Sequence, residues 1–131
     1  MNMAIVFYPD IEEMKSEYKS DGMLVPRFLF EEKKFRKLSA EAKLLYARLI
    51  ELESEAAKQK QFDFKGDAYV VMTYREVQEF LNCSCRKAQA VLRELDDTYN
   101  GGVNLILKTQ WGRGFKTRIY VHMYKRNNES D

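Results

Sequence analysis

Two short amphipathic helical patterns follow one another between residues 73 and 95. Thr73 and Glu76 have the spacing of a capping box, in which each side chain bonds a backbone N–H at a helix start. The apolar residues that follow recur three and four positions apart, as one buried helical face requires. They are Val77, Phe80 and Leu81. The pattern therefore predicts a helix that begins at Thr73 and packs by this face.

The second pattern begins almost at once, because only Asn82 and Cys83 separate it from the first. Ser84 is a good N-cap residue for the new helix. Its apolar positions repeat the spacing i, i+3, i+4, i+7. They are Ala88, Val91, Leu92 and Leu95. The chain thus predicts two helices joined by a tight turn.

The opposite side of the second helix carries the polar residues. At 100° per residue, Arg86, Ala90 and Arg93 project away from the apolar stripe, with Lys87 and Gln89 beside them. Arg can bond guanine bidentately, Gln can bond adenine, and a small Ala permits close approach to a thymine methyl. The alternative is an ordinary solvated face, since Arg, Lys and Gln are good helix formers. The helix alone leaves both interpretations open.

The segment after this helix predicts a β-hairpin. Residues 100–102 reverse the chain, residues 103–109 are rich in branched apolar side chains, and residues 110–115 form a glycine-containing tip. Residues 116–124 alternate in part. Their apolar members, expected on one side, are Ile119, Val121 and Met123. A hairpin after a helix-turn-helix is a wing, so the expected fold is α+β, a winged helix-turn-helix with a C-terminal β-hairpin wing.

Basic residues concentrate in this half of the chain. Residues 84–126 contain nine Lys or Arg and three Asp or Glu, whereas residues 1–83 are slightly more acidic than basic. The net charge of +2 conceals this polarity, which is typical of nucleic-acid-binding proteins. We expect Arg86, Gln89, Ala90 and Arg93 to read bases in the major groove of double-stranded DNA. The expected contacts to the DNA backbone are Ser84, Lys87, Lys108, Arg113, Lys116 and Arg118.

The middle of the chain predicts a scaffold. Ser39 is the expected cap of a long helix with a single apolar stripe. The stripe comprises Leu38, Ala42, Leu45, Tyr46, Leu49, Leu52 and Ala56. Residues 62–72 are predicted to form a strand that pairs with the wing, and residues 25–30 an extended segment, because Pro26 disfavours helix in its predecessor. The winged-helix domain is expected to span residues 25–126.

Residues 1–24 form a predicted N-terminal arm, and residues 127–131 a polar tail or the start of a linker. The arm combines an apolar start with a weakly helical, charged stretch. It either folds back on its own domain or exchanges with a second subunit. Because many helix-turn-helix proteins bind twofold sites, we expect a homodimer.

Other classes of protein find little support. No apolar run approaches the ~20 residues that span a bilayer, and no secretory signal is evident, so the expected location is the cytoplasm without membrane association. Cys83 and Cys85, with the lone His122, do not make a four-ligand zinc site, and we expect reduced thiols and no metal or other cofactor. The sequence offers no recognisable catalytic constellation, so no enzymatic activity is expected.

Three stretches resemble the N-terminal domain of plasmid replication initiator protein A of Gram-positive bacteria. They are PRFLFEEKKFRKLSAEAKLLYARLIELES, FDFKGDAYVVMTYREVQEFLNCSCRKAQAVLREL and GRGFKTRIYVHMY. Together they cover most of residues 26–124, and the run from Leu38 to Tyr46 is the most distinctive part. Gln61 and Phe62 replace the family's usual asparagine and tryptophan, in a loop position.

The resemblance implies sequence-specific binding to repeated sites at a replication origin. It also implies a separate C-terminal part that recruits host replication proteins, which this chain does not contain. Two alternatives stay open, a winged-helix transcriptional repressor and a winged helix used for protein–protein contacts. One palindrome in the bound DNA would favour the repressor and direct repeats the initiator, while weak salt dependence would favour protein contacts.

Overall fold

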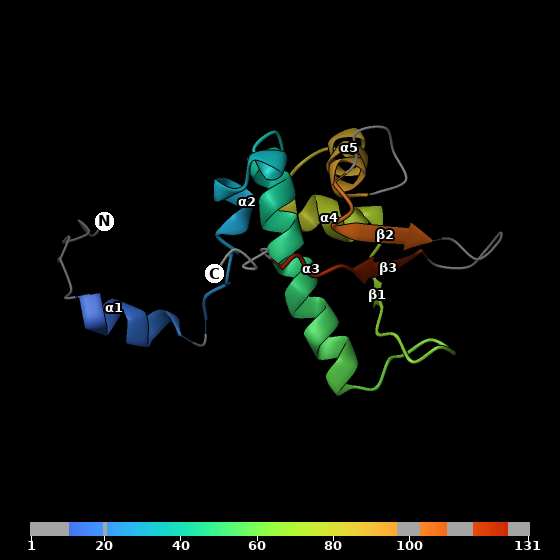
Figure 1. Cartoon of the computed structure of the whole chain (residues 1–131), viewed down its shortest axis with the longest axis horizontal. Helices are drawn as coiled ribbons and strands as arrows, with labels where there is room; N and C mark the ends of the chain where they lie inside the picture. Colours follow the sequence, from blue (N-terminus) through green and yellow to red (C-terminus); the bar gives the residue numbers. More distant parts are fainter. Residues whose placement is uncertain (1–10, 20, 97–102, 110–116, 126–131) are drawn as a thin grey trace, which may run out of the picture.

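A computed structural model describes residues 11–19, 21–96, 103–109 and 117–125. Its helices are α1 (Ile11–Tyr18), α2 (Phe28–Glu31), the 3-10 turn η1 (Lys33–Phe35), α3 (Ala40–Lys58), α4 (Tyr74–Leu81) and α5 (Cys85–Leu95). Its strands are β1 (Val70–Val71), β2 (Ile106–Thr109) and β3 (Arg118–Val121). Figure 1 shows α3 crossing the body, with α4 and α5 at one end of it beside the β2–β3 pair.

The predicted caps set where the helices begin. Thr73 and Glu76 form a reciprocal capping box at the start of α4, and the Ser84 hydroxyl accepts the N–H of Lys87 at the start of α5. Ser39 accepts the N–H of Ala42 at the start of α3. The Ser39 N–H and hydroxyl in turn donate to the Glu94 carboxylate of α5, at 2.7 and 2.8 Å. This pair of hydrogen bonds fixes the start of the scaffold helix to α5.

The three long helices of the body enclose one apolar core. The predicted stripe of α5 is fully buried. That of α3 is buried apart from Leu52, which is partly covered. Tyr46 donates a 2.5 Å hydrogen bond to the carbonyl oxygen of His122, just after β3, and so ties α3 to the sheet. The core therefore rests on side chains from both halves of the chain.

The small sheet has the strand order β1-β3-β2 and is antiparallel throughout. Val70 of β1 lies opposite Ile119 of β3, so the segment 62–72 pairs with the C-terminal strand, as predicted. Because paired residues share a face, Val70, Ile106 and Ile119 lie on one side, and all three are buried against the helices. We call this side the inner face of the sheet. The outer face carries Leu107 and Tyr120, which lie opposite each other.

The α+β class is confirmed, but several element bounds differ from the predictions. Among the described residues, the strands take two residues of 62–72, four of 103–109 and four of 117–124, with an isolated bridge between Phe62 and Ala68. Val121, the last residue of β3, has no partner in β1. Its N–H donates instead to the Glu53 carboxylate of α3, at 3.0 Å. Met123 lies outside the strand and is exposed. Side chains and turns thus replace ladder partners that the alternating pattern had suggested.

Two further predictions were wrong. The expected extended segment at residues 25–30 contains α2, because proline restricts its predecessor and not the residues after it. The Pro26 carbonyl accepts the N–H of Leu29 and opens the turn. Phe80 is 37% exposed at the edge of the face on which α4 buries Val77 and partly buries Leu81, so the buried face is narrower than predicted.

Helix α1 stands apart from this arrangement. None of its residues is buried, and Figure 1 shows it separate from the body of the molecule. Its apolar side chains Ile11, Met14 and Tyr18 recur at i, i+3 and i+7 and are exposed. Neither α1 nor any other described helix is long and apolar enough to cross a membrane.

Candidate nucleic-acid interface

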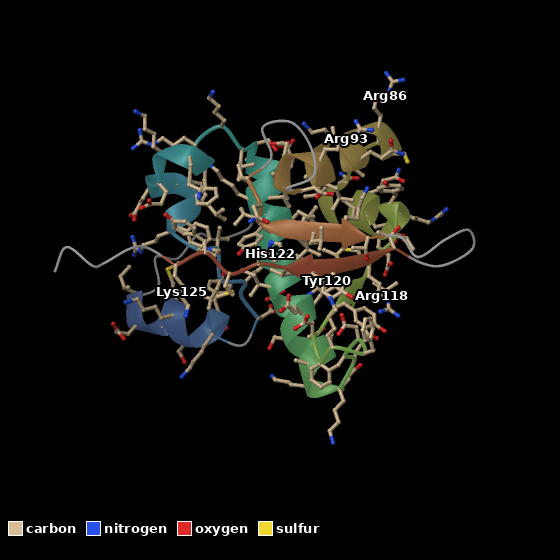
Figure 2. The ribbon with its side chains drawn as sticks, turned by 45° about the vertical axis from the view of Figure 1, so that its right-hand side comes forward. Arg86, Arg93, Arg118, Tyr120, His122 and Lys125 are labelled. Carbon is tan, nitrogen blue, oxygen red and sulfur yellow. The ribbon has the colours of Figure 1, made fainter. Side chains whose placement is uncertain are left out.

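The predicted reading helix presents its polar side to solvent. Arg86, Lys87, Ala90 and Arg93 of α5 are exposed, and Gln89 is half-buried. Figure 2 shows Arg86 and Arg93 extending from α5 away from the sheet. The first turn of α5 contains no acidic residue, so the positive end of the helix dipole adds to these charges. The outward placement of these residues agrees with the helical periodicity.

The turn between α4 and α5 sets the position of this helix. Asn82 adopts the left-handed conformation, with φ 54°, and its N–H bonds the Gln78 carbonyl. Asn tolerates this conformation better than most non-glycine residues. Ser84, also exposed, follows directly and caps α5. One left-handed residue therefore allows the chain to leave one helix and enter the next within three residues.

Lys87 and Gln89 each have a weak partner within the molecule. Lys87 Nζ lies 3.7 Å from a carboxylate oxygen of Glu41, and both side chains are well exposed, so the pair is weak. Gln89 Nε2 donates a long hydrogen bond of 3.5 Å to Cys85 Sγ. Either partner can be exchanged for a ligand at low cost.

Lys108 lies on the inner face of the sheet, opposite Ile119. Its Nζ donates to the Tyr74 hydroxyl at 2.9 Å and lies 5.2 Å from the centre of the Tyr74 ring. Tyr74 is the first residue of α4, so this contact joins the hairpin to the helix pair. The ammonium group is therefore held on the same side of the sheet as α4 and α5.

Arg118 is placed differently. It pairs with Thr109 and lies on the outer face, where its guanidinium is 4.2 Å from the centre of the Tyr69 ring. In Figure 2 it lies across the β2–β3 pair from Arg86 and Arg93. The structure thus brings Lys108 to the helix side and separates Arg118 from it. Arg113 and Lys116, the other predicted wing contacts, fall outside the described residues.

Two exposed residues at the start of α4 were missed in the sequence. Tyr74 carries the hydroxyl that holds Lys108, and Arg75 adds an exposed cation to the same helical turn. The signal was available, because both lie between Thr73 and Glu76 of the capping box, in the first turn of a helix whose start the sequence predicts. They extend the basic surface beyond α5.

The remaining candidate groups do not assemble into a site for another ligand. Cys83 is half-buried and Cys85 exposed, and both are free thiols. His122 Nδ1 lies 2.8 Å from the side-chain oxygen of Asn104. Within the described part of the chain, no three His, Cys, Asp or Glu side chains gather as metal ligands would.

Together these features define a class of protein. A helix pair with a tight turn, a basic face on its second helix and a small antiparallel sheet behind it make an α+β domain built on a helix-turn-helix arrangement. The chain belongs to the family "Replication initiator protein A (RepA) N-terminus", whose model matches residues 23–131. This match confirms the resemblance found in the sequence.

Solved structures share this fold. The structure described as "N-Terminal domain of DNA binding protein" superposes with a TM-score of 0.71 at 21% identity, covering 95% of this chain and 88% of that chain. "Structure of Rep-DNA complex" superposes with a TM-score of 0.70 at 21% sequence identity, covering 93% of this chain and 88% of that chain. "Structure of MDR initiator" superposes with a TM-score of 0.69 at 22% sequence identity, covering 93% of this chain and 90% of that chain. The chain matches no curated protein sequence.

Proposed function

We propose that this chain is a winged helix-turn-helix domain that binds double-stranded DNA in replication initiation, at repeated sites of an origin. The observation that carries the proposal is the exposed basic face of α5, with Arg86 and Arg93 directed outward and no acidic residue in the first turn. Membership of the replication initiator protein A family and the similarity to a Rep–DNA complex support it.

In this proposal α5 enters the major groove. Arg86, Gln89, Ala90 and Arg93 contact base edges, where Arg bonds guanine and Gln bonds adenine. Ser84 and Lys87 at the start of α5, with Lys108 held by Tyr74, contact phosphates. The β2–β3 pair forms the base of the wing, and Arg113 and Lys116 extend the phosphate contacts along it. Arg118, which lies on the outer face beside the Tyr69 ring, contributes less.

Footprinting on the DNA that encodes and surrounds this gene tests the proposal. We expect protection of several spaced direct repeats. Binding should weaken steeply with salt, because releasing ions from about five phosphates makes log K fall with log salt. Protection of a single palindrome would contradict initiation and favour a transcriptional repressor. Absence of any protection would contradict DNA binding and favour a domain used for protein–protein contacts.

We also propose that the domain acts as a homodimer in which α1 contributes to the interface. The apolar side chains of Ile11, Met14 and Tyr18 are exposed on one helix that buries none of its residues. A second copy would cover them, as contiguous exposed apolar groups commonly require. Sedimentation of the chain should show a dimer, and Met14→Lys should shift it toward monomer. A monomer at high protein concentration would contradict this part.

A further inference from the structure

The outer face of the sheet forms one wall of a concave pocket of about 440 Å³. We call it the outer pocket. Its other walls are α3, near Glu53, and the turn at residues 63–67. It is lined by Glu53, Asp63, Phe64, Lys65, Asp67, Ala68, Leu107, Thr109, Tyr120, Val121 and His122. None of the α5 residues proposed to read DNA lines it.

Asp63 holds the turn in shape. One of its carboxylate oxygens accepts the N–H groups of Lys65 and Asp67, each at 2.9 Å. The other accepts the Tyr120 hydroxyl at 3.0 Å, which fastens the turn to β3. Gly66, with φ +90°, supplies the left-handed residue that closes the turn. These bonds lower the pKa of Asp63, first through the Asp67 N–H, so the carboxylate stays charged and the wall stays fixed.

The pocket carries an excess of negative charge. Three of its described lining residues are acidic and one, Lys65, is basic, while the Arg118 guanidinium lies beside the pocket and interacts with Tyr120. Glu53 uses one oxygen to bond Val121, and its burial raises the pKa of the carboxyl. Asp67 is exposed at the rim. The three carboxylates therefore favour a cation over a phosphate at this position.

Apolar surface lies beside these carboxylates. Phe64 is 81% exposed, and Lys65 Nζ lies 5.8 Å from the centre of its ring, so the ring already has a cation nearby and is open to solvent elsewhere. Leu107 and Tyr120 form the half-buried floor. A Lys or Arg side chain matches this combination, because its aliphatic stem packs on apolar groups while its charge meets a carboxylate or an aromatic face.

We propose that the outer pocket docks a short extended segment of a partner protein, in which a Lys or Arg lies next to an apolar residue. Charge complementarity selects the cationic residue, and Phe64, Leu107 and Tyr120 receive the apolar one. Because the pocket and α5 lie on opposite sides of the sheet, the partner and DNA bind without competing. This site goes beyond the proposed DNA binding and stands on different residues.

The test is an NMR titration of the full chain, labelled with ¹⁵N, with the peptide acetyl-Leu-Arg-Leu-Lys-amide. We expect amide shifts at Glu53, Phe64 and Tyr120. They should be smaller with acetyl-Gly-Arg-Gly-Lys-amide and absent with acetyl-Leu-Glu-Leu-Glu-amide. Absence of pocket shifts at millimolar peptide, or equal shifts with all three peptides, would overturn the proposal. Pocket shifts that appear on raising protein concentration alone would identify a second copy as the occupant and also overturn it.

Variants of the pocket separate docking from folding. Phe64→Ala and Glu53→Gln should each weaken the peptide by about three- to fivefold, as contacts at partly exposed sites do. Gln retains an oxygen for the Val121 N–H, and the exposed Phe64 ring contributes little to the core. Leu24→Ala, at a side chain 88% exposed, and Glu55→Gln, on the same helix as Glu53, are matched controls and should bind as wild type.

Unchanged peptide affinity in both pocket variants would contradict the assignment. All four variants should bind DNA as wild type does, since none alters the α5 face. If the chain binds the peptide but not DNA, the proposed function is wrong and the docking proposal stands. If the chain binds DNA but not the peptide, the proposed function stands and the docking proposal is wrong.

Discussion

The two faces of the small sheet differ in almost every respect that matters for binding. On the inner face, Ile106 and Ile119 are buried against the helices, and Lys108 is held beside the start of α4, on the side where α5 exposes its arginines. On the outer face, Leu107 and Tyr120 floor a pocket rich in carboxylates. The outer face also carries one cation, Arg118 beside Tyr69. In our two proposals the sheet separates the surface that contacts phosphate from the pocket that receives a cationic peptide.

The largest loss of stability should come from replacing a buried residue of the central strand, on which both faces of the sheet depend. Ile119 is fully buried in the central strand β3. Ile119→Ala should lower the free energy of unfolding by about 2 to 5 kcal/mol, through lost burial and the cavity left behind. The urea midpoint should fall, and DNA and peptide binding should weaken together. Tyr120→Ala, on the outer face, is the comparison, and equal destabilisation by both would contradict the assignment of faces.

A smaller loss is expected at the link between α3 and α5. Glu94→Ala removes the carboxylate that accepts from the Ser39 N–H and hydroxyl. Because a charged acceptor is lost and a half-buried donor left unpaired, unfolding should cost about 1 to 3 kcal/mol less. Thermal or urea unfolding measures this loss. Glu55→Ala, an exposed change on α3, should have little effect, and equal losses would refute the role of the link.

The hydrogen bond from the Tyr46 hydroxyl of α3 to the His122 carbonyl, just after β3, should stabilise the fold less at alkaline pH. Burial, with the nearby Glu53 charge as a second cause, raises the pKa of Tyr46 to about 12 from an ordinary value of 10.0. Since the folded state holds this proton more tightly, its contribution is full below pH 10.0 and is lost as pH rises toward about 12. Urea unfolding across this range should show the decline.

The matched variant is Tyr46→Phe. It should lose about 1 kcal/mol at neutral pH, the value of one hydrogen bond, because it cannot donate to the His122 carbonyl. Its stability should also fall less than that of wild type between pH 10.0 and about 12. Parallel pH profiles for the two proteins would contradict the assignment of the titrating group.

The smallest expected effect is on DNA affinity, and it compares two cations of the β2–β3 pair. Lys108 lies on the helix side of the sheet, whereas Arg118 lies on the outer face over Tyr69. Lys108→Ala should weaken all DNA sequences alike and reduce the salt slope by about 1, as loss of one phosphate contact does. Arg118→Ala should do less. Fluorescence anisotropy at several salt concentrations measures both, and a larger effect at Arg118 would move the DNA path toward the outer face.

Local signals account for what the sequence could predict. The capping box of Thr73 and Glu76 and the N-caps Ser39 and Ser84 act within three residues, so they are legible in a single chain. The apolar stripe of α5 has the helical period over its full length and is buried as expected. These features placed the helices and the outward face of α5 before any contact between distant residues was known.

Contacts between distant residues account for the rest. Glu94 meets Ser39, and Glu53 meets Val121, across 55 and 68 residues, and no local pattern announces either bond. At the end of β3, the Val121 N–H donates to the Glu53 carboxylate, where the sequence pattern predicts a strand partner. The outer pocket could not be predicted either, since it exists only where the turn fixed by Asp63 meets Tyr120 of β3.

The proposal that α5 reads DNA can be tested most directly by comparing the affinity of Arg86→Ala for a protected origin repeat with its affinity for a scrambled duplex. We predict a loss of about 1 to 3 kcal/mol on the repeat and a reduced preference for it over the scrambled DNA. Lys58→Ala, which removes an exposed cation at the far end of α3, should leave both affinities unchanged. If Arg86→Ala binds both duplexes as wild type does, α5 is not the reading helix.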